Sequence, residues 1–292
     1  MSDPRPRPLL VAALAATALA LGGLGWLARD LSSPGGRPSL LDFLDLAPAA
    51  GRPLPGARPA PPPPAPMAWA SPLQARCPRP DPQLRQRLLP LLQRLRDSPE
   101  RVVIDPSNYG ERHRHDAFGN PLDTRPRLVV LHETVFGIES ALNTFRTPHP
   151  RDEDQVSYHA LIGLDGAVKQ LVDPRQRAFG AGNSAFRGEW AITNPAVGGS
   201  VNNFALHVSL ETPIDGEHDG SSHSGYTQPQ YDALAALLAL WMSRYEIGAD
   251  RITTHRAVDL GGERADPRSF DWQQLQRRFQ SLGLLCERPQ LG

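Results

Sequence analysis

The sequence predicts an α/β fold, a single domain in which helices flank a central mixed β-sheet. Short apolar runs with the composition of strands recur along the chain, at residues 128–131, 156–162, 168–171, 204–210 and 251–254. A long helical segment separates the last two of these runs. Strands mixed with helices in this way indicate one sheet with helices packed on it.

Two helices are predicted from the spacing of apolar residues. The longer covers residues 229–245, where Thr227 and Gln230 have the spacing of a capping box. Four of its large apolar side chains share one face: Leu234, Leu237, Leu238 and Trp241. A second helix is expected at residues 84–95, where leucines recur at helical spacing and Pro90 interrupts the pattern. We expect it to pack in front of the main domain; a partner-binding helix is the alternative.

The N-terminal segment predicts an association with a membrane. Residues 8–28 carry no charge, and as a helix they would span about 31 Å, roughly one hydrocarbon core. Apolar residues continue past a candidate signal-peptidase site at residues 18–20, which favours an uncleaved anchor over a removed signal. The sequence thus predicts a short cytoplasmic tail (1–8), an anchor or signal segment (9–28) and a periplasmic catalytic domain in a single-pass membrane protein, or a secreted protein if the segment is cleaved.

Proline is concentrated between this segment and the domain. Many of the 31 prolines lie before residue 82, four of them in a row at 61–64. Such a stretch has too little apolar surface to offset the entropy of ordering, and it favours extended polyproline conformations. We predict a disordered linker over residues 29–80 and the domain over residues 81–292.

Charge content limits the classes of partner that the protein could bind, and cysteine content bears on whether it has a disulfide. Lys plus Arg and Asp plus Glu each number 31, and no basic stripe occurs, which argues against a nucleic-acid partner. The two cysteines, Cys77 and Cys286, flank the domain. In an exported protein such a pair favours a disulfide; two free thiols are the alternative.

Three residues have the chemistry of a hydrolytic zinc site. His132 and His255 each close a short strand-like run, and Asp266 follows the second histidine closely. Two imidazoles and one carboxylate leave a fourth tetrahedral position open for water. We predict that His132, His255 and Asp266 bind Zn²⁺.

Four segments that include these residues occur in a recognisable order, at 130–134, 156–166, 202–211 and 254–258. They resemble the zinc-dependent N-acetylmuramoyl-L-alanine amidases, a family that includes phage lysozyme-type amidases, anhydro-muropeptide amidases and peptidoglycan recognition proteins. The likeness covers about residues 102–279 and implies an amidase/peptidoglycan-recognition-like fold. In that family the positions that match His132, His255 and Asp266 bind zinc, although some members carry Cys in place of the Asp.

The resemblance implies an enzyme that hydrolyses the amide bond between N-acetylmuramic acid and L-alanine in peptidoglycan or its fragments. Two alternatives stay open. One is a peptidoglycan-binding receptor without activity, because some family members bind muropeptides without cutting them. The other is a zinc amidohydrolase acting on a different N-acylated peptide. The complete set of three ligands favours the amidase.

Three further residues are predicted to act in catalysis. Tyr158 matches a tyrosine that is linked to activity in phage-type amidases, and we expect its hydroxyl to act as an oxyanion donor or a proton donor. Arg264 stands where relatives often carry Lys, and a fixed cation there could stabilise the same oxyanion. Glu211 shares a strand face with Ser209, the position of a glutamate in the anhydro-amidases, so Glu211 is predicted as the general base.

The remaining predictions concern the surroundings of the site. The loop at residues 179–184 matches a segment where many relatives place a histidine, but Gly180 stands there in this chain. Asn183 and Ser184 of this loop are predicted to bind the peptide stem of the substrate. His159 is expected beneath the site and not on the metal, because neighbouring strand residues point to opposite faces. The insert at residues 215–225 is expected to be a polar surface loop.

Overall fold

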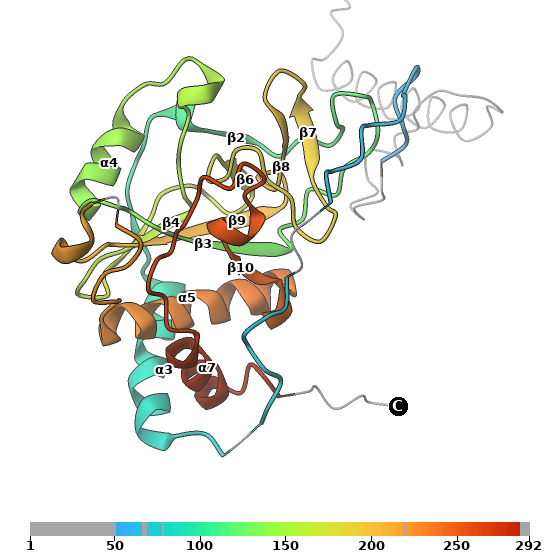
Figure 1. Cartoon of the computed structure of the whole chain (residues 1–292). Helices are drawn as coiled ribbons and strands as arrows, with labels where there is room; N and C mark the ends of the chain where they lie inside the picture. Colours follow the sequence, from blue (N-terminus) through green and yellow to red (C-terminus); the bar gives the residue numbers. More distant parts are fainter. Residues whose placement is uncertain (1–50, 66–68, 78, 219, 287–292) are drawn as a thin grey trace, which may run out of the picture. The chain divides into compact units, whose positions relative to one another are not determined.

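A six-stranded sheet forms the centre of the domain in the computed structural model, which describes residues 51–65, 69–77, 79–218 and 220–286 (Figure 1). Its strand order is β1-β5-β4-β9-β3-β10. Neighbouring strands are parallel except for β4 with β5, which are antiparallel. The predicted α/β fold around a central mixed sheet is confirmed. The strands are β1 (Glu100–Arg101), β3 (Leu128–Glu133), β4 (Ala160–Ile162), β5 (Val168–Gln170), β9 (Ala205–Leu210) and β10 (Ile252–Thr254).

The two longest strands of the sheet, β3 and β9, are buried at every position. Strands of a parallel sheet with both faces covered are apolar almost throughout, and successive side chains alternate between the faces. Val129 and Leu131 of β3 therefore join the main core. Val130 faces the opposite side, and so by the same alternation does His132, which places a buried imidazole on the face away from that core.

One face of the sheet is covered by α3 (Pro82–Asp97), α5 (Gln228–Tyr245) and α7 (Trp272–Leu282), as Figure 1 shows. The predicted capping box at the start of α5 is confirmed, with Thr227 and Gln230 each bonded to the other's backbone N–H. Most of α5 is buried, because the sheet, α3 and α7 surround it. The predicted apolar face is thus one side of a helix that lies inside the domain.

Helix α3 confirms the predicted packing helix and continues through Pro90 as a single element. Asp81 caps its N-terminus by accepting from two backbone N–H groups. Leu84 and Leu88 are buried, and Arg87 pairs with Asp232 of α5 at 2.6 Å. These contacts dock α3 on the helical layer of the domain.

The opposite face of the sheet carries shorter elements (Figure 1). They are the helix α4 (Ile138–Arg146), the one-turn helix α6 (His255–Val258), and two antiparallel pairs: β2 (Tyr109–Glu111) with β6 (Gln176–Ala178), and β7 (Ala191–Asn194) with β8 (Gly198–Ser200). Loops connect these elements over the carboxyl ends of the central strands. This face holds the candidate site.

The described part of the proline-rich stretch has no helix or strand but contacts the domain. The backbone N–H groups of Leu54 and Arg58 donate to Gly119 and Phe118, at 2.9 and 3.0 Å. Leu73, further along, is buried in the main core. The predicted domain boundary at residue 81 stays a prediction; the disordered linker predicted over 29–80 does not extend to the residues that make these contacts.

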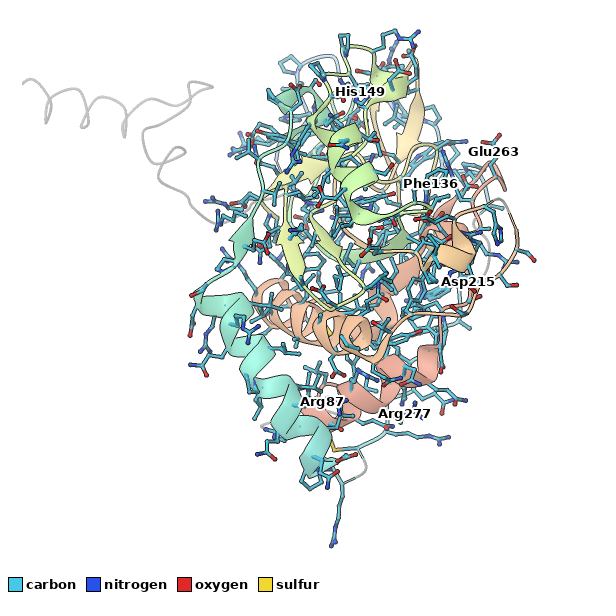
Figure 2. All side chains as sticks on the ribbon, turned by 90° about the vertical axis from the view of Figure 1, so that its left-hand side faces the viewer. Arg87, Phe136, His149, Asp215, Glu263 and Arg277 are labelled. Carbon is cyan, nitrogen blue, oxygen red and sulfur yellow. A yellow bond between two sulfur atoms is a disulfide. The ribbon has the colours of Figure 1, made fainter. Side chains whose placement is uncertain are left out.

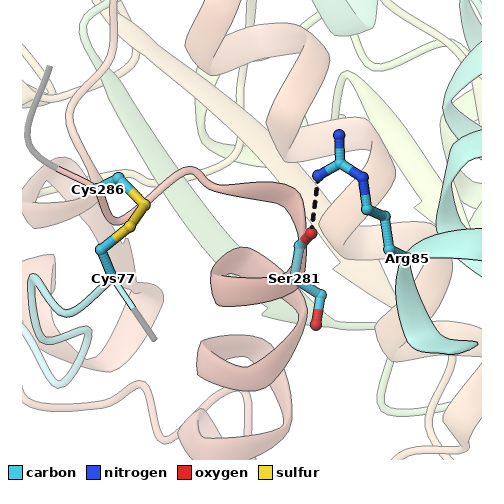
Figure 3. Close-up of a disulfide and its surroundings, with 4 residues drawn as sticks. All are labelled: Cys77, Arg85, Ser281 and Cys286. Atoms are coloured by element: carbon cyan, nitrogen blue, oxygen red, sulfur yellow. Dashed lines mark hydrogen bonds between the residues drawn. A yellow bond between two sulfur atoms is a disulfide. The ribbon is translucent and has the colours of Figure 1, made fainter. Parts of the chain in front are cut away.

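Cys77 and Cys286 form a disulfide, as predicted (Figure 3). The bridge joins residues 209 positions apart. Beside it, Arg85 of α3 donates to the carbonyl of Ser281 at 3.0 Å. The disulfide therefore links the segment before α3 to the segment after α7, and the hydrogen bond links the two helices themselves.

Candidate metal centre and active site

The two histidines of the predicted triad lie side by side because they stand at the carboxyl ends of adjacent parallel strands, His132 within β3 and His255 just after β10. In the pairing of β10 with β3, Thr254 lies opposite Leu131. His132 and His255 each come next along the chain, so both stand at the carboxyl edge of the sheet. Ligands in open α/β sheets bind at this edge. Figure 2 shows Phe136, Asp215 and Glu263, from the loops after β3, β9 and β10, on one side of the domain.

The loop after α6 brings the carboxylate of Asp266 to the two imidazoles. The carbonyl of Asp266 accepts from the backbone N–H of Arg256 at 3.0 Å, which holds the loop against α6. Oδ2 of Asp266 lies 3.3 Å from Nδ1 of His132 and 3.2 Å from Nδ1 of His255. The structure thus brings together all three predicted metal ligands.

The spacing of these atoms fits a zinc ion. Bonds of about 2.0–2.1 Å in a tetrahedral site place the ligand atoms about 3.3–3.4 Å apart, close to both measured distances to Asp266. One ligand atom from each of the three residues lies within 4.8 Å of the other two. His132 and Asp266 are shielded from solvent, with 0% and 14% of their side chains exposed.

The protonation states also suit a metal, because ligands must be deprotonated to bind it. Burial lowers the pKa of His132 to about 4, so its imidazole is neutral near pH 7. Burial alone would raise the pKa of the Asp266 carboxyl, but its hydrogen bonds with His132 and His255 outweigh that effect and the pKa lies below its usual value. His132 therefore offers a neutral nitrogen and Asp266 a carboxylate.

Tyr158 lies against the triad, as predicted. Its ring stacks on His132 with the ring centres 4.5 Å apart, and it packs nearly perpendicular to the ring of Phe145 from α4, with the centres 5.4 Å apart. Burial raises the pKa of Tyr158 above its usual value, so the phenol keeps its proton and can act as a hydrogen-bond donor.

A cleft of about 400 Å³ opens beside these groups. Its lining includes Tyr158, His255, Arg264 and Gly180. The size is in the range of small-ligand sites. Arg264 is exposed at the rim of this cleft, so its guanidinium is available to a bound substrate.

Glu211 is not brought to the metal ligands, which corrects its prediction as a general base. Its Oε1 accepts from the backbone N–H of Ile138 at 2.9 Å, and its Oε2 accepts from that of Leu164 at 2.8 Å. The carboxylate therefore joins the start of α4 to the β4–β5 turn. It lies just beyond the end of β9, where strand alternation no longer determines its direction.

We expect Glu211→Gln to lower stability without changing the metal site. The amide oxygen can accept only one of the two backbone N–H bonds, and because neither donor is fully buried, losing one bond should cost about 0.5–1.5 kcal/mol. The unfolding free energy should fall by this amount, while zinc content and turnover per folded molecule stay at the parent values. Urea unfolding, metal analysis and an activity assay measure these three quantities. A loss of turnover at full zinc occupancy would support the original prediction that Glu211 is the general base.

The two predicted substrate residues of the 179–184 loop lie in different places. Ser184 is buried; its hydroxyl donates to the carbonyl of Gly182 at 3.0 Å and accepts from the N–H of Val201 at the same distance. It therefore shapes the loop and is not in the cleft, which corrects its prediction. Asn183 is exposed and is not among the residues that line the cleft.

His207 of β9 belongs to the site but was missed by the sequence analysis. Its Nδ1 lies 3.0 Å from Nε2 of His132, the ring nitrogen that faces away from Asp266. A Cβ at Gly180 would lie 2.4 Å from this ring. Many relatives carry a histidine at the position of Gly180, and the glycine here makes room for His207. The missing histidine in the loop was therefore the feature of the sequence that could have indicated a role for His207.

A buried charge network supports the triad from the other side of β3. Glu133 accepts from Tyr226 Oη at 2.6 Å and lies 3.1 Å from Nε2 of His223. Arg268 donates to it through both its backbone N–H and its side-chain Nε. His223 is fully buried, so the insert at 215–225 is not simply the polar surface loop that was predicted.

His159 lies beneath the site, next to His207, as expected. The backbone N–H of His207 donates to its Nδ1 at 2.9 Å, and the two rings are nearly parallel. Burial, together with the nearby charge of Arg112, lowers the pKa of His159 to about 3. The ring is therefore neutral in the folded protein over most of the acidic range.

This pKa predicts a loss of stability in acid. An unfolded histidine has a pKa near 6.5, so below that value the unfolded chain binds a proton that folded His159 does not bind. The unfolding free energy should fall by roughly 2 kcal/mol from this residue alone between pH 7.5 and pH 5. Urea unfolding of metal-free parent and His159→Gln at both pH values measures it. An equal fall in the variant would contradict the assignment.

Comparison with known proteins places the chain in a family. The family model described as N-acetylmuramoyl-L-alanine amidase matches residues 122–269, a range that includes all three candidate ligands. The chain belongs to this family. The family membership predicted from sequence is confirmed.

Curated relatives also match part of the chain. A 1,6-anhydro-N-acetylmuramyl-L-alanine amidase, AmpD, from Citrobacter freundii is 33% identical over 130 residues, which cover 44% of this chain and 57% of the relative. The AmpD of Enterobacter cloacae is 31% identical over 186 residues, which cover 58% of this chain and 88% of the relative. This chain thus covers little more than half the length of the first relative and most of the length of the second.

Solved structures of amidases also match. A selenomethionine derivative of AmpD is 27% identical, with a TM-score of 0.45, and the match covers 61% of this chain and 93% of that one. AmiD from E. coli, solved with anhydro-N-acetylmuramic acid-L-Ala-D-gamma-Glu-L-Lys, is 22% identical with a TM-score of 0.43, and the match covers 59% of this chain and 65% of that one.

The predicted localisation is wrong. The relatives that match are AmpD amidases, and among the residues that the structure describes no helix is long and apolar enough to cross a membrane. A spanning helix needs about 20 predominantly apolar residues, whereas α5, with 18 residues, includes Gln228, Asp232 and Arg244. The predicted anchor or signal segment, 9–28, and the tail before it lie outside the described residues.

Proposed function

We propose that this chain is a zinc-dependent amidase that hydrolyses the bond between N-acetylmuramic acid and L-alanine in peptidoglycan fragments. The observation that carries the proposal is the spacing of His132, His255 and Asp266, which suits a tetrahedral metal and leaves one position free beside an open cleft. The anhydro-muropeptide amidases among the relatives indicate the chemical class of the substrate.

The three ligands would hold the metal with the two Nδ1 atoms and the Asp266 carboxylate. A zinc ion held there supplies a water of lowered pKa and polarises the amide carbonyl. The residues of the protein would supply the remaining functions. The cleft binds the substrate and orients its amide, and the protonated phenol of Tyr158, stacked on His132, can donate to the carbonyl oxygen as negative charge develops there.

Arg264 supplies a permanent positive charge at the same cleft. A guanidinium is a planar cation that can donate two parallel hydrogen bonds. Its position two residues before Asp266 keeps it near the reacting carbonyl. We assign it the stabilisation of the oxyanion together with Tyr158, and we assign no proton transfer to Glu211 because both of its oxygens accept from backbone N–H groups.

The decisive experiment uses the purified full chain with anhydro-muropeptides and, separately, with whole sacculi. New amino termini of L-alanine should appear, and a chelator should abolish their release until zinc is returned. Binding of muropeptide without release would instead establish the receptor. Release from another N-acylated peptide in preference to muropeptides would establish the broader amidohydrolase.

Tyr158→Phe tests the role of the phenol. Removing one donor to an oxyanion costs about 10²–10³-fold in kcat, and we expect a loss in this range with zinc content unchanged. The ring and its stacking on His132 are retained, so the unfolding free energy should change by less than about 1 kcal/mol. A variant with parent kcat would remove Tyr158 from the mechanism.

A further inference from the structure

The face of His132 that points away from the metal position is occupied by a second buried imidazole. Nε2 of His132 and Nδ1 of His207 are 3.0 Å apart, and both rings are fully buried. Neither a carboxylate nor a carbonyl of the described residues bonds to this nitrogen of His132. Metal-binding histidines usually donate their second N–H to one of those two groups, so the partner here is unusual.

We propose that His207 is a positioning residue that holds the metal ligand His132 by accepting a hydrogen bond from its Nε2. The inference rests on the proposed zinc site. When Nδ1 of His132 gives its lone pair to a metal, the proton of the neutral ring resides on Nε2. Nε2 then donates to Nδ1 of His207, which must be unprotonated, and the proton of His207 resides on its own Nε2.

The surroundings of His207 agree with a fixed role for its ring. Its Nε2 has no hydrogen-bond partner among the described residues, although it is buried. A buried polar atom without a partner is unfavourable, so packing alone would be served better by an apolar side chain. Gly180 leaves no space between its own backbone and the ring, since a Cβ there would come within 2.4 Å. The ring is thus confined in the orientation that faces His132.

The metal also determines the direction of this hydrogen bond. When no metal is bound, Nδ1 of His132 can keep a proton and donate it in a hydrogen bond to the neighbouring Asp266 carboxylate. The lone pair of His132 Nε2 would then accept from Nδ1–H of His207. Metal binding at Nδ1 reverses donor and acceptor. A neutral imidazole partner permits both arrangements, whereas a carboxylate could only accept, and it orients His132 without adding a negative charge beside the metal.

Two substitutions of His207 separate the hydrogen bond from the packing. His207→Asn retains an acceptor near the position of Nδ1, and His207→Leu fills similar space without one. We expect His207→Leu to weaken zinc affinity by 10–100-fold, and His207→Asn to stay within about threefold of the parent. Competition with a chromophoric chelator measures the affinity in full-length protein. His159→Asn is the control, because His159 is equally buried and contacts His207 but not the metal ligands; its zinc affinity should match the parent.

Parent affinity in a folded His207→Leu protein would overturn the inference, and so would an equal loss in the Asn and Leu variants. Nitrogen-15 spectra of histidine-labelled parent protein give a second test that needs no variant. With zinc bound, His132 should carry its proton on Nε2 and His207 on Nε2; a proton on Nδ1 of His207 in the zinc-loaded protein would refute the proposal. If the parent binds no zinc, the proposed function itself fails, which is distinguishable from a failure of the role of His207 alone.

Discussion

Replacing His132 or His255 with Ala should abolish stoichiometric zinc binding and hydrolysis together. Each imidazole supplies one of three protein ligands. A catalytic zinc site needs all three, with the fourth position taken by water or substrate, so two ligands are too few to hold the metal. Several kcal/mol of transition-state stabilisation should be lost with the metal, which corresponds to roughly 10³-fold or more in rate. Metal analysis of the purified variants and release of L-alanine amino termini measure the two effects.

His113→Ala is the matched control for these variants. His113 is exposed, and it is neither part of the triad nor among the residues that line the cleft. Its replacement should leave zinc content and turnover unchanged. Full zinc occupancy in His132→Ala and His255→Ala would reject the metal assignment even if both variants were inactive, because activity alone would then have been lost for another reason.

The metal ligands could be predicted from sequence because their positions follow from local rules. A histidine that ends a buried strand lies at the edge of the sheet, and two parallel neighbours bring two such residues together. The register of β10 on β3 is what places His255 beside His132. Tyr158 was identified by resemblance alone, since no local pattern indicates that its ring stacks on His132.

Glu211 shows where strand alternation stops being informative. The residue lies on the expected face only while the chain remains a strand, and β9 ends at Leu210. Beyond that point its carboxylate satisfies two backbone N–H groups from separate loops. Those donors, at Ile138 and Leu164, are distant in sequence. The local sequence pattern therefore could not show that the Glu211 carboxylate bonds to backbone N–H groups and does not face the metal ligands.

His207 and Glu133 were missed for a related reason. Each lies within a buried strand whose other residues are mostly apolar, and its partner comes from elsewhere in the chain: His132 for His207, and Arg268 for Glu133. A polar residue in an otherwise apolar strand does indicate a buried partner, because an unpaired one is costly. Identifying that partner requires the tertiary structure.

Removing the cation of this network should have the largest effect on stability. Arg268 pairs with Glu133, and their side chains are only 6% and 1% exposed. Its guanidinium also donates to three carbonyls of the insert, those of Gly216, His218 and Gly220. Arg268→Met leaves the Glu133 carboxylate buried without its cation, and breaking a buried pair in this way costs about 3–5 kcal/mol.

The loss should extend from stability to the metal site. Arg268 stands two residues after Asp266, and its backbone N–H donates to Glu133 at 3.1 Å, so the network holds the loop that carries the third ligand. Urea unfolding should show the loss of 3–5 kcal/mol expected for a broken buried pair, and zinc affinity should fall with it. The double variant Glu133→Leu with Arg268→Met should regain much of the stability, because no unpaired charge remains. Arg125→Met, which removes an exposed pair with Asp123, should change stability by less than about 0.5 kcal/mol. A double variant no more stable than Arg268→Met would show that the carbonyl contacts of Arg268, and not the charge of Glu133, account for the loss.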